Sequence, residues 1–176
     1  MTIGRLAQRE TTAVRDAAPP RVRPARVRDL DAVVALRLAL LREHPDHPIY
    51  GRLRTEIDRR ARDLFASQLR GTTESILLAE LDGAVVGILR CVETNGSPLL
   101  EPDRYGYVSS VYVRPESRRR GVLRALLDEA ERWCRARGLN QMRLHNVAGS
   151  AAEHAWDAMG FRIVEQVRLR ELEPRR

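Results

Sequence analysis

The chain has 176 residues, of which 43% are hydrophobic and 31% are charged, a composition that is ordinary for a soluble globular domain. No apolar run is long enough to cross a membrane, and residues 1–18 lack the hydrophobic stretch of a secretory signal, so we expect a cytoplasmic protein without a membrane partner. The net charge of +7 rests on arginine alone, because the sequence contains no lysine, and this excludes catalysis through a covalent lysine intermediate.

Cysteine and histidine usage argues against disulfide and metal chemistry. The two cysteines, Cys91 and Cys134, stand far apart without a C-x-x-C motif, so neither a disulfide framework nor a zinc site is predicted. His44, Asp46 and His47 lie close together, but prolines interrupt the segment and no further strong ligand is near. We therefore expect no metal site.

Residues 1–20 are polar and end in two alanines and two prolines, which predicts a flexible tail before one domain over residues 21–176. A short strand is expected over residues 21–27. Asp29 is then suited to cap a helix whose apolar residues recur at helical spacing. These residues are Leu30, Val33, Val34, Leu38 and Leu41. The segment 44–48, His-Pro-Asp-His-Pro, ends that helix.

A second helix is expected next, because one apolar face runs through residues 53–69. Its members are Leu53, Ile57, Ala61, Leu64, Phe65 and Leu69. Two strands follow over residues 75–81 and 84–92, and Asp82-Gly83 between them is a signal for a two-residue hairpin turn. The segment 95–98, Asn-Gly-Ser-Pro, ends the second strand.

The last third of the chain alternates strand and helix patterns. Residues 105–113 form a strand with apolar or small residues on both faces, and residues 121–137 form an amphipathic helix that Gly138 is suited to end. A strand is expected over residues 141–147. A capping box at Ser150 then starts a short helix that ends at Gly160, and a final strand pattern covers residues 161–172. This order predicts a single α+β domain.

The segment 108–127 carries the clearest functional signal. An apolar strand leads through Pro115 into an arginine cluster around Gly121, and an amphipathic helix begins at once. Such a turn directs unpaired backbone N–H groups at one point, and the helix dipole adds positive potential there. We therefore predict an anion cradle formed by the amides of residues 119–123. The dipole supplies only about 0.3–2 kcal/mol of the roughly 8 kcal/mol that micromolar binding needs, so other contacts must contribute.

Three motifs in this order resemble the GNAT superfamily of N-acetyltransferases over about residues 22–172. The opening V-R-P-A-R-V-R-D-L-D resembles the family's first strand and helix start. The arginine cluster resembles the acetyl-CoA motif R/Q-x-x-G-x-G/A, with Arg118 first and Gly121 as its first glycine. The segment A-x-x-x-W-x-x-x-G-F over residues 152–161 resembles the motif of the family's last helix. The resemblance implies a GNAT-like α+β fold with a mixed, mostly antiparallel central sheet flanked by helices.

The resemblance also implies where acetyl-CoA binds. Its pantetheine arm hydrogen-bonds the edge of the preceding strand like an added strand, which implies the backbone of Val111 and Val113. Gly149 or Ser150 lies where many relatives have an asparagine that contacts pantetheine. The full set of expected cofactor-binding residues is Val111, Tyr112, Val113, Arg118, Arg119, Arg120, Gly121, Val122, Leu123, Arg124, Ser150 and Trp156.

Two residues of the cradle depart from the family pattern. Leu123 stands where a small residue is usual, so its side chain must turn toward the core. Arg119 stands where glycine is common. Leucine keeps its backbone amide, so binding can survive, and we expect Val122 and Leu123 to be tolerated variants.

The catalytic groups are predicted less directly. An amine of pKa about 10.4 needs roughly 4.6 kcal/mol to lose its proton at pH 7, so a general base is expected. The family often takes a carboxylate from the strand before the cradle, where this chain has Ser109 and Ser110. We expect Ser110 to hold a relaying water and Glu93 to accept the proton; the alternative is that Glu93 is a surface carboxylate. Trp156 stands where the family usually has a tyrosine, so either it packs against the cofactor or water or Tyr112 protonates the leaving thiolate.

The predicted function is acetyl-CoA-dependent transfer of an acetyl group directly to a primary amine of a small molecule, an amino acid or a peptide. Residues 44–69 and 95–104 are expected to form the acceptor pocket. The alternative is a catalytically weak GNAT-like module that senses acyl-CoA. Nucleic-acid binding is not expected, because only 5% of the residues are aromatic and acids are interspersed among the arginines. Members of the family often dimerise, so the resemblance allows a homodimer.

Overall fold

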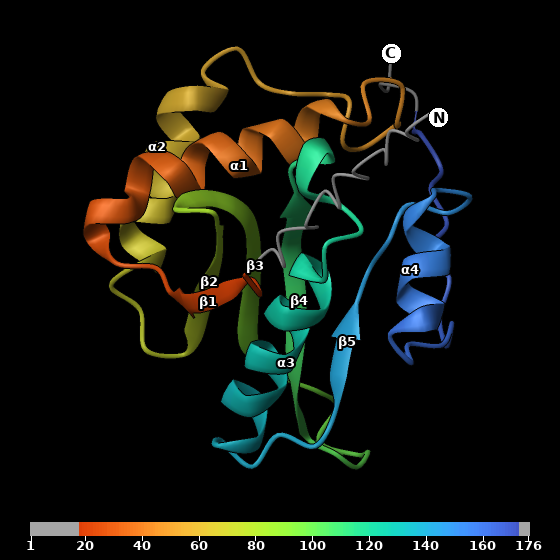
Figure 1. The fold of residues 1–176 in the computed structure, drawn as a ribbon. Helices are drawn as coiled ribbons and strands as arrows, with labels where there is room; N and C mark the ends of the chain where they lie inside the picture. The colour runs from red at the N-terminus through yellow and green to blue at the C-terminus, as the bar shows by residue number, and fades with distance from the viewer. Residues whose placement is uncertain (1–17, 173–176) are drawn as a thin grey trace, which may run out of the picture.

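The computed structural model of the protein describes residues 18–172, which form a five-stranded sheet with helices on both faces (Figure 1). The strands lie in the sheet in chain order, and each neighbouring pair is antiparallel except the last, which is parallel. They are β1 (Arg21–Pro24), β2 (Glu74–Leu81), β3 (Ala84–Asn95), β4 (Arg104–Val113) and β5 (Met142–Leu144). The predicted α+β fold with a mixed, mostly antiparallel sheet is confirmed.

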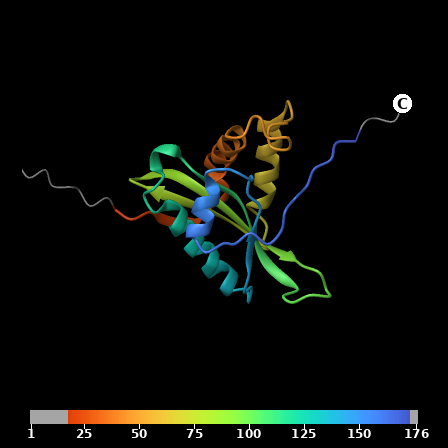
Figure 2. The same cartoon turned by 90° about the vertical axis from the view of Figure 1, so that its right-hand side faces the viewer.

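The helices divide between the two faces of the sheet. One face is covered by α1 (Leu30–Arg42) and α2 (Ile57–Gln68) and is called the α1 face below; the opposite face is covered by α3 (Val122–Arg135) and is called the α3 face (Figure 2). A short helix, α4 (Ala152–Ala158), follows β5. Two single turns of 3₁₀-helix, Val27–Asp29 and Pro115–Ser117, precede α1 and α3. No helix in residues 18–172 is both long and apolar enough to span a bilayer.

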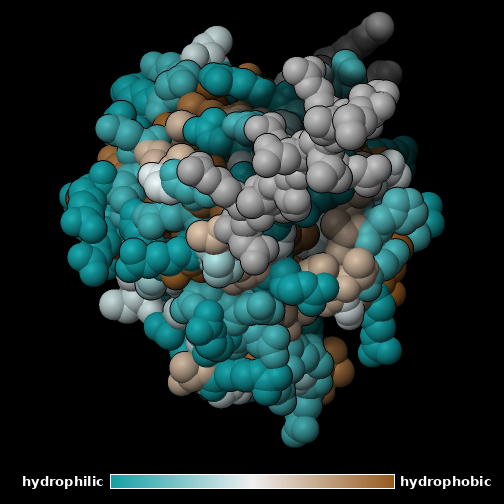
Figure 3. Space-filling view, viewed as in Figure 1, coloured by the Kyte–Doolittle hydropathy of each residue, from teal (hydrophilic) through white to brown (hydrophobic). Residues whose placement is uncertain are grey.

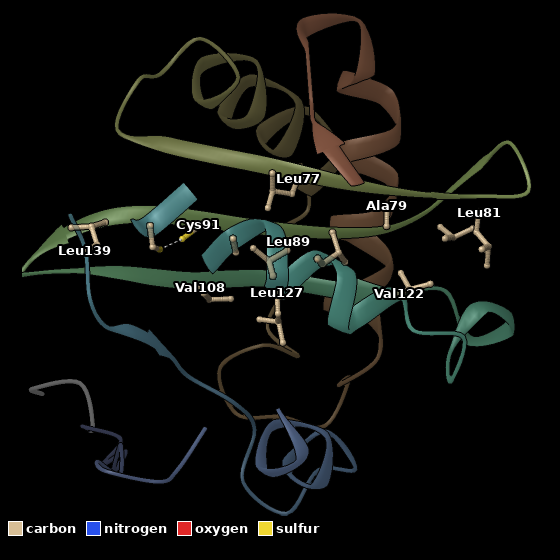
Figure 4. Packing of buried hydrophobic residues seen from close by; sticks show 13 residues of the cluster. Leu77, Ala79, Leu81, Leu89, Cys91, Val108, Val122, Leu127 and Leu139 are labelled. Atoms are coloured by element: carbon tan, nitrogen blue, oxygen red, sulfur yellow. Dashed lines mark hydrogen bonds between the residues drawn. The ribbon is translucent and has the colours of Figure 1, made fainter. Parts of the chain in front are cut away.

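Two apolar clusters fill the space between the sheet and the helices, because successive side chains of a strand point to opposite faces. In β2, Leu77 packs under α3, while its neighbour Leu78 packs under α1 and α2. Figure 4 shows the cluster under α3, to which β3, β4 and α3 also contribute. The outer surface seen in Figure 3 is largely hydrophilic.

Two glycines allow α3 to lie close to the sheet. A Cβ atom on Gly87 of β3 would lie 3.0 Å from Val122 Cγ1, at the start of α3. A Cβ atom on Gly106 of β4 would lie 2.4 Å from Cys134 Sγ, near the end of the helix. Any side chain at Gly106 would therefore collide with the buried sulfur. The two close approaches set the position of the N-terminus of α3 above the sheet.

Several local signals are confirmed. Asp82 and Gly83 have φ angles of 52° and 80°, as a tight turn between antiparallel strands requires. Gly138 has a φ angle of 72°, and the N–H of Leu139 donates to the Cys134 carbonyl at 3.0 Å, which closes α3 as a Schellman motif. Asp29 directly precedes α1 as predicted, but its carboxylate binds Arg23 and the backbone N–H of Arg26 instead of capping α1.

Three other expectations differ from the structure. The second helix begins at Ile57, so Leu53 lies outside it. The capping box at Ser150 does not form, because α4 begins two residues later and the Glu153 carboxylate accepts the N–H of Gly149 at 3.0 Å. The predicted tail falls mainly on residues 1–17, which lie outside the described residues.

The final strand expected over residues 161–172 is absent, and this segment extends away from the sheet (Figure 2). A strand needs a neighbour that accepts its backbone hydrogen bonds, and β5 offers a ladder of only three residues. The apolar residues of the segment are exposed: they are Ile163, Val164, Val167, Leu169 and Leu172.

Candidate functional site

The edge of β4 opens where β5 leaves it. β5 pairs only with Gly106, Tyr107 and Val108, and the chain after β5 turns away toward α4 (Figure 1). Within residues 18–172, no strand therefore pairs with this edge of β4 from Ser109 to Val113. An extended ligand can hydrogen-bond such an edge as an added strand.

A bulge in β4 lies at the opening. Ser109 is opposite Arg90, and Tyr112 is opposite Ile88. Between these two pairs β4 therefore contains one residue more than β3. Ser110 has a φ angle of 54°, which costs a residue with a side chain of the order of 1 kcal/mol. The bulge is therefore a local feature that the surrounding sheet must stabilise.

The backbone of Val111 and Val113 faces the open edge. The N–H of Arg114 donates to the Val86 carbonyl of β3 at 2.9 Å, and alternation along the strand turns the residues before and after it the other way. The side chain of Arg118 donates from Nε to the Val113 carbonyl at 3.0 Å, so this acceptor is occupied. Val111 has no register partner on β3.

The turn before α3 presents a run of free N–H groups. In the described part of the chain, no protein group accepts a hydrogen bond from any backbone N–H between Arg119 and Arg124. Arg119 and Gly121 have φ angles of 58° and 78°, and Gly121 is the N-cap of α3. Left-handed residues in such a turn bring consecutive N–H groups to one side, where the helix dipole is also positive. This is the geometry that an anion cradle needs.

The arginines of the cradle differ in their partners. Arg118 forms an ion pair with Glu43 and lies 5.9 Å from the Tyr112 ring centroid, and Arg120 binds Asp82 at 2.9 Å. Within the described residues, neither Arg119 nor Arg124 forms an ion pair. These last two guanidinium groups are the ones available to an incoming anion.

The two aliphatic residues that open α3 turn inward. Val122 is buried, and Leu123 packs against the cluster on the α3 face, as its place in the motif requires. Their backbone N–H groups still point into the turn. The bulk of Leu123 therefore leaves the cradle open.

Tyr112, Ser150 and Trp156 have different surroundings. Tyr112 is in the cluster on the α1 face, and burial raises the pKa of its phenol. Trp156 packs against the α3 cluster and meets Phe161 edge to face, with ring centroids 5.7 Å apart. The hydroxyl oxygen of Ser150 is buried without a hydrogen-bond partner in the described structure. A buried hydroxyl of this kind is usually satisfied by water or a ligand.

The structure does not bring Glu93 and Ser110 together. Glu93 lies opposite Gly106 and binds the Arg104 guanidinium. Gly106 and Ser110 are four residues apart along β4, a separation of about 13 Å at the usual rise of a strand. Glu93 also follows Cys91 by two residues, and Cys91 belongs to the α3 face. A proton route between Ser110 and Glu93 would therefore have to span a long distance along the sheet.

The loop over residues 95–104, expected at the acceptor pocket, lies at the other end of α3. Part of it lines a surface hollow together with Gly138, Asn140 and Gln141. A helix of the length of α3 is about 21 Å long, so this hollow is far from Gly121 at its N-terminus. The other expected pocket segment, residues 44–69, supplies Tyr50 near Arg37.

Sequence reasoning missed a polar group on the α1 face beside the bulge. Arg90 binds the Glu74 carboxylate and approaches the Ser109 hydroxyl at 3.4 Å. The Tyr107 hydroxyl is hydrogen-bonded to His145 Nδ1 at 3.1 Å. Burial lowers the pKa of the Arg37 guanidinium on α1, and Arg90 and Tyr107 are among its neighbours. A usable signal was present, since arginine at positions 37 and 90 interrupts otherwise apolar patterns.

A family model described as "Acetyltransferase (GNAT) family" matches residues 37–161. Solved structures match nearly the whole fold, although no curated protein matches the sequence at a significant level. One is a predicted acetyltransferase with acetyl-CoA from Clostridium acetobutylicum, with 20% identity, a TM-score of 0.70, and coverage of 86% of this chain and 96% of that chain.

Two further structures show the same fold. A GCN5-related N-acetyltransferase from Ralstonia eutropha has 23% identity and a TM-score of 0.71, with coverage of 86% of this chain and 98% of that chain. An aminoglycoside 6′-N-acetyltransferase from Acinetobacter haemolyticus has 20% identity and a TM-score of 0.68, with coverage of 88% and 99%.

Proposed function

Because the chain belongs to the GNAT family of acetyltransferases, we propose that it transfers the acetyl group of acetyl-CoA directly to a primary amine of a small molecule, an amino acid or a peptide. The observation that carries this proposal is the run of unpaired backbone N–H groups from Arg119 to Arg124 at the start of α3. Six adjacent donors at a helix N-terminus suit the diphosphate of a coenzyme better than any neutral ligand. Arg119 and Arg124 add two guanidinium groups without carboxylate partners in the described structure.

Further contacts are available for the rest of the coenzyme. The free edge of β4 at Val111 supports a strand-like contact with the pantetheine arm. The Ser150 hydroxyl, which is buried without a hydrogen-bond partner among the described residues, offers a further donor or acceptor. Trp156 packs between α4 and the sheet, where its indole can border the cofactor. These contacts add to the modest contribution of the helix dipole.

Acetyl transfer then needs a group that removes a proton from the amine. Ser110 remains a candidate for holding a water beside the bulge. His145 is better placed than Glu93 to accept the proton, because it follows directly after Leu144, the register partner of Val108. Its hydrogen bond to Tyr107 orients the ring on the α1 face. Histidine is the commonest general base in enzymes.

Direct transfer implies a simple balance of bonds. The amine nitrogen forms a bond to the thioester carbon, the carbon–sulfur bond breaks, and the amine proton passes to the base. The thiolate takes a proton from water or from Tyr112, whose raised pKa keeps its hydroxyl protonated at neutral pH. Cys91 and Cys134 are both buried under α3 and take no part.

A catalytically weak sensor of acyl-CoA is the alternative. It is favoured by serines at positions 109 and 110 and by Trp156 where relatives usually have tyrosine. Both functions require coenzyme binding. Only the enzyme releases free CoA in the presence of an amine.

One pair of measurements tests these functions. Acetyl-CoA at about 100 times its dissociation constant should stabilise the fold by about 2.7 kcal/mol, which raises the melting temperature by roughly 5–10 °C. Thiol release is then followed with and without a panel of amines. Without a thermal shift, both functions are wrong; with a shift but no amine-dependent thiol release, the sensor remains.

The exposed C-terminal segment supports a homodimer. Residues 161–172 carry a strand pattern without a strand partner, and the outer edge of β5 is unpaired within the described residues. Exchange of this segment between two copies would cover both features. Light scattering should give a dimer that becomes monomeric in Val167→Asp and persists in the neighbouring control Arg168→Ala. A monomeric native protein at tens of micromolar would exclude this assembly.

A further inference from the structure

Arg37 is a partly buried cation without an anionic partner. It lies in the middle of α1 between Leu36 and Leu38, which are 1% and 4% exposed. Within residues 18–172, no carboxylate forms an ion pair with it. Burying a charge is costly unless it is paired, so such a guanidinium is suited to bind a ligand's anionic group.

The groups around Arg37 do not neutralise it. Tyr50, Arg90 and Tyr107 are neighbours of Arg37. The two tyrosines offer no carboxylate, and Arg90 is a second cation. Glu74 is the nearby carboxylate on this face, and it is already bound to Arg90. Arg37, Arg90 and Glu74 together therefore carry one excess positive charge. The local excess of positive charge is fixed by β3 and α1 and does not depend on a mobile loop.

This excess lies beside the proposed point of transfer. Arg90 Nη1 is 3.4 Å from the Ser109 hydroxyl, and Ser109 directly precedes the bulge at Ser110. The free edge of β4 starts at the same residue. Consider an acceptor that approaches from the α1 face and places its amine at the bulge. The acceptor atoms next to that amine would then lie close to Arg37 and Arg90.

We infer that Arg37 and Arg90 bind the carboxylate of an acceptor whose primary amine is on the adjacent carbon, which makes the acceptor a free amino acid. This inference rests on the proposed acetyl transfer. Guanidinium groups bind carboxylates through paired N–H donors, and the fork of Arg37 is free to do so. A polycationic amine, such as an aminoglycoside, would instead bring positive charge against two guanidinium groups.

The same two arginines would assist the chemistry. Nearby positive charge disfavours the ammonium form of the bound amine, so it lowers the free energy needed to produce the reactive neutral amine. An amino acid bound by its carboxylate would therefore be both positioned and more easily deprotonated. A carboxamide of the same amino acid would lose the charged contact while keeping the amine and the side chain.

The test compares acid and carboxamide acceptors. Glycine, racemates of the other common amino acids that have a primary amine, and the carboxamides of all of them are supplied with acetyl-CoA, and CoA release is measured. The native protein should use its best amino acid with a kcat/KM at least 100-fold above that of the matching carboxamide. In Arg37→Gln, kcat/KM for the acid should fall at least 50-fold, while the value for the carboxamide, which depends on Arg37 only through the pKa of its amine, should fall much less, so that the preference for the acid drops at least tenfold.

Two further variants serve as controls. Arg37→Lys keeps the charge without the fork and should retain at least a tenth of the native preference for the acid. Arg62→Gln removes an exposed arginine that binds Asp31 on the same side of the protein and should leave both substrates unchanged. The comparison of acid with carboxamide in the native protein does not depend on the folding of any variant.

The outcomes separate the two proposals. Equal or better use of carboxamides or of aminoglycosides would overturn the carboxylate site while supporting acetyl transfer. If no amine releases CoA, binding of the amino acids to the CoA-bound protein is measured by calorimetry. Binding that is lost in Arg37→Gln would then support the carboxylate site while acetyl transfer fails, and absence of binding would overturn both.

Discussion

Arg23 and Asp29 form a two-point ion pair, with Nη1 to Oδ2 at 2.8 Å and Nη2 to Oδ1 at 2.9 Å, which joins β1 to the start of α1. Arg23 also donates from Nε to Glu80 of β2 at 2.7 Å. The paired guanidinium and the backbone N–H of Arg26 lower the pKa of Asp29 from 3.8 to about 2. The charged form of Asp29 is therefore favoured by the folded state.

Because of this ion pair, we expect the free energy of unfolding to depend on pH in the acidic range. Because the pKa of Asp29 is lower in the folded state, its contribution is complete above about pH 5 and is lost as the pH falls from there through about 2. Asp29→Asn should lose about 1 kcal/mol of unfolding free energy at pH 7, after allowance for solvent screening, and almost none at pH 2. Urea unfolding at both pH values measures this difference. Asp31→Asn, whose partner Arg62 is exposed, should show a smaller effect; an equal effect would contradict the assignment.

We expect Arg119 to lower the stability of the fold and to strengthen the binding of acetyl-CoA. Its φ angle of 58° is strained for any residue with a Cβ atom. Arg119→Gly should therefore be about 0.5–1 kcal/mol more stable than Arg119→Ala, in which the strain remains. Both variants lose the same guanidinium and should bind acetyl-CoA about tenfold more weakly, or about 1.4 kcal/mol. Chemical unfolding and calorimetry measure the two effects, and unchanged affinity would mean that Arg119 does not contact the coenzyme.

The proton acceptor is tested by a matched pair of variants. His145→Gln should lower kcat/KM about 100-fold and remove the fall in rate on the acidic side of the pH profile, because the general base is lost. Glu93→Gln should leave the rate and the pH profile unchanged within twofold, since Glu93 binds Arg104 away from the bulge. A normal profile in His145→Gln would exclude this histidine. A profile altered in Glu93→Gln would restore the carboxylate as the base.

We expect mutations of Gly106 and Cys134 to have coupled effects on the free energy of unfolding. Gly106→Ala should destabilise the fold by about 1–3 kcal/mol, because the new methyl group would lie where Cys134 Sγ now packs. Cys134→Ala removes that sulfur and should rescue part of the loss. A double-mutant cycle should give a coupling of at least about 1 kcal/mol, whereas additive effects would show that the helix moves away instead.

The parts of the fold that could be predicted from the sequence depend on local signals. Asp82-Gly83 and Gly138 occur at positions where only a few residue types allow the required backbone, so each marks its turn. The same holds for Gly121 before α3, where the local pattern also indicates the direction of the free N–H groups. Such features depend on a few adjacent residues, and tertiary packing does not change them.

The parts that could not be predicted depend on register. Glu93 was paired with Ser110 because β3 and β4 were expected to be neighbours, yet adjacency does not say which residues are opposite. The bulge at Ser110 shifts the pairing by one residue and decides which side chains share a face. Arg37 and Arg90 each interrupt an apolar pattern, but they are brought together only by the packing of α1 on the sheet, and neither segment by itself indicates that the two arginines meet.

The segment 161–172 shows a different limit. Its alternating pattern is typical of a strand, but a strand forms only where a neighbour completes its hydrogen bonds. The three-residue length of β5 could not be read from its own sequence, since the pattern there extends to Val147. The side-chain pattern therefore indicates a tendency to form a strand, but no strand forms because the segment has no neighbouring strand to pair with.

The placement of the two sulfur atoms has a practical consequence for every assay of this protein. Cys91 and Cys134 are 0% and 1% exposed, and their sulfurs touch each other at 3.5 Å beneath α3 (Figure 4). A colorimetric disulfide reagent added to the native enzyme should therefore react with the coenzyme's thiol and give almost no background colour from the polypeptide. Slow colour development in a blank without coenzyme would instead report the rate at which α3 separates from the sheet. The same reagent therefore also measures local opening of the protein.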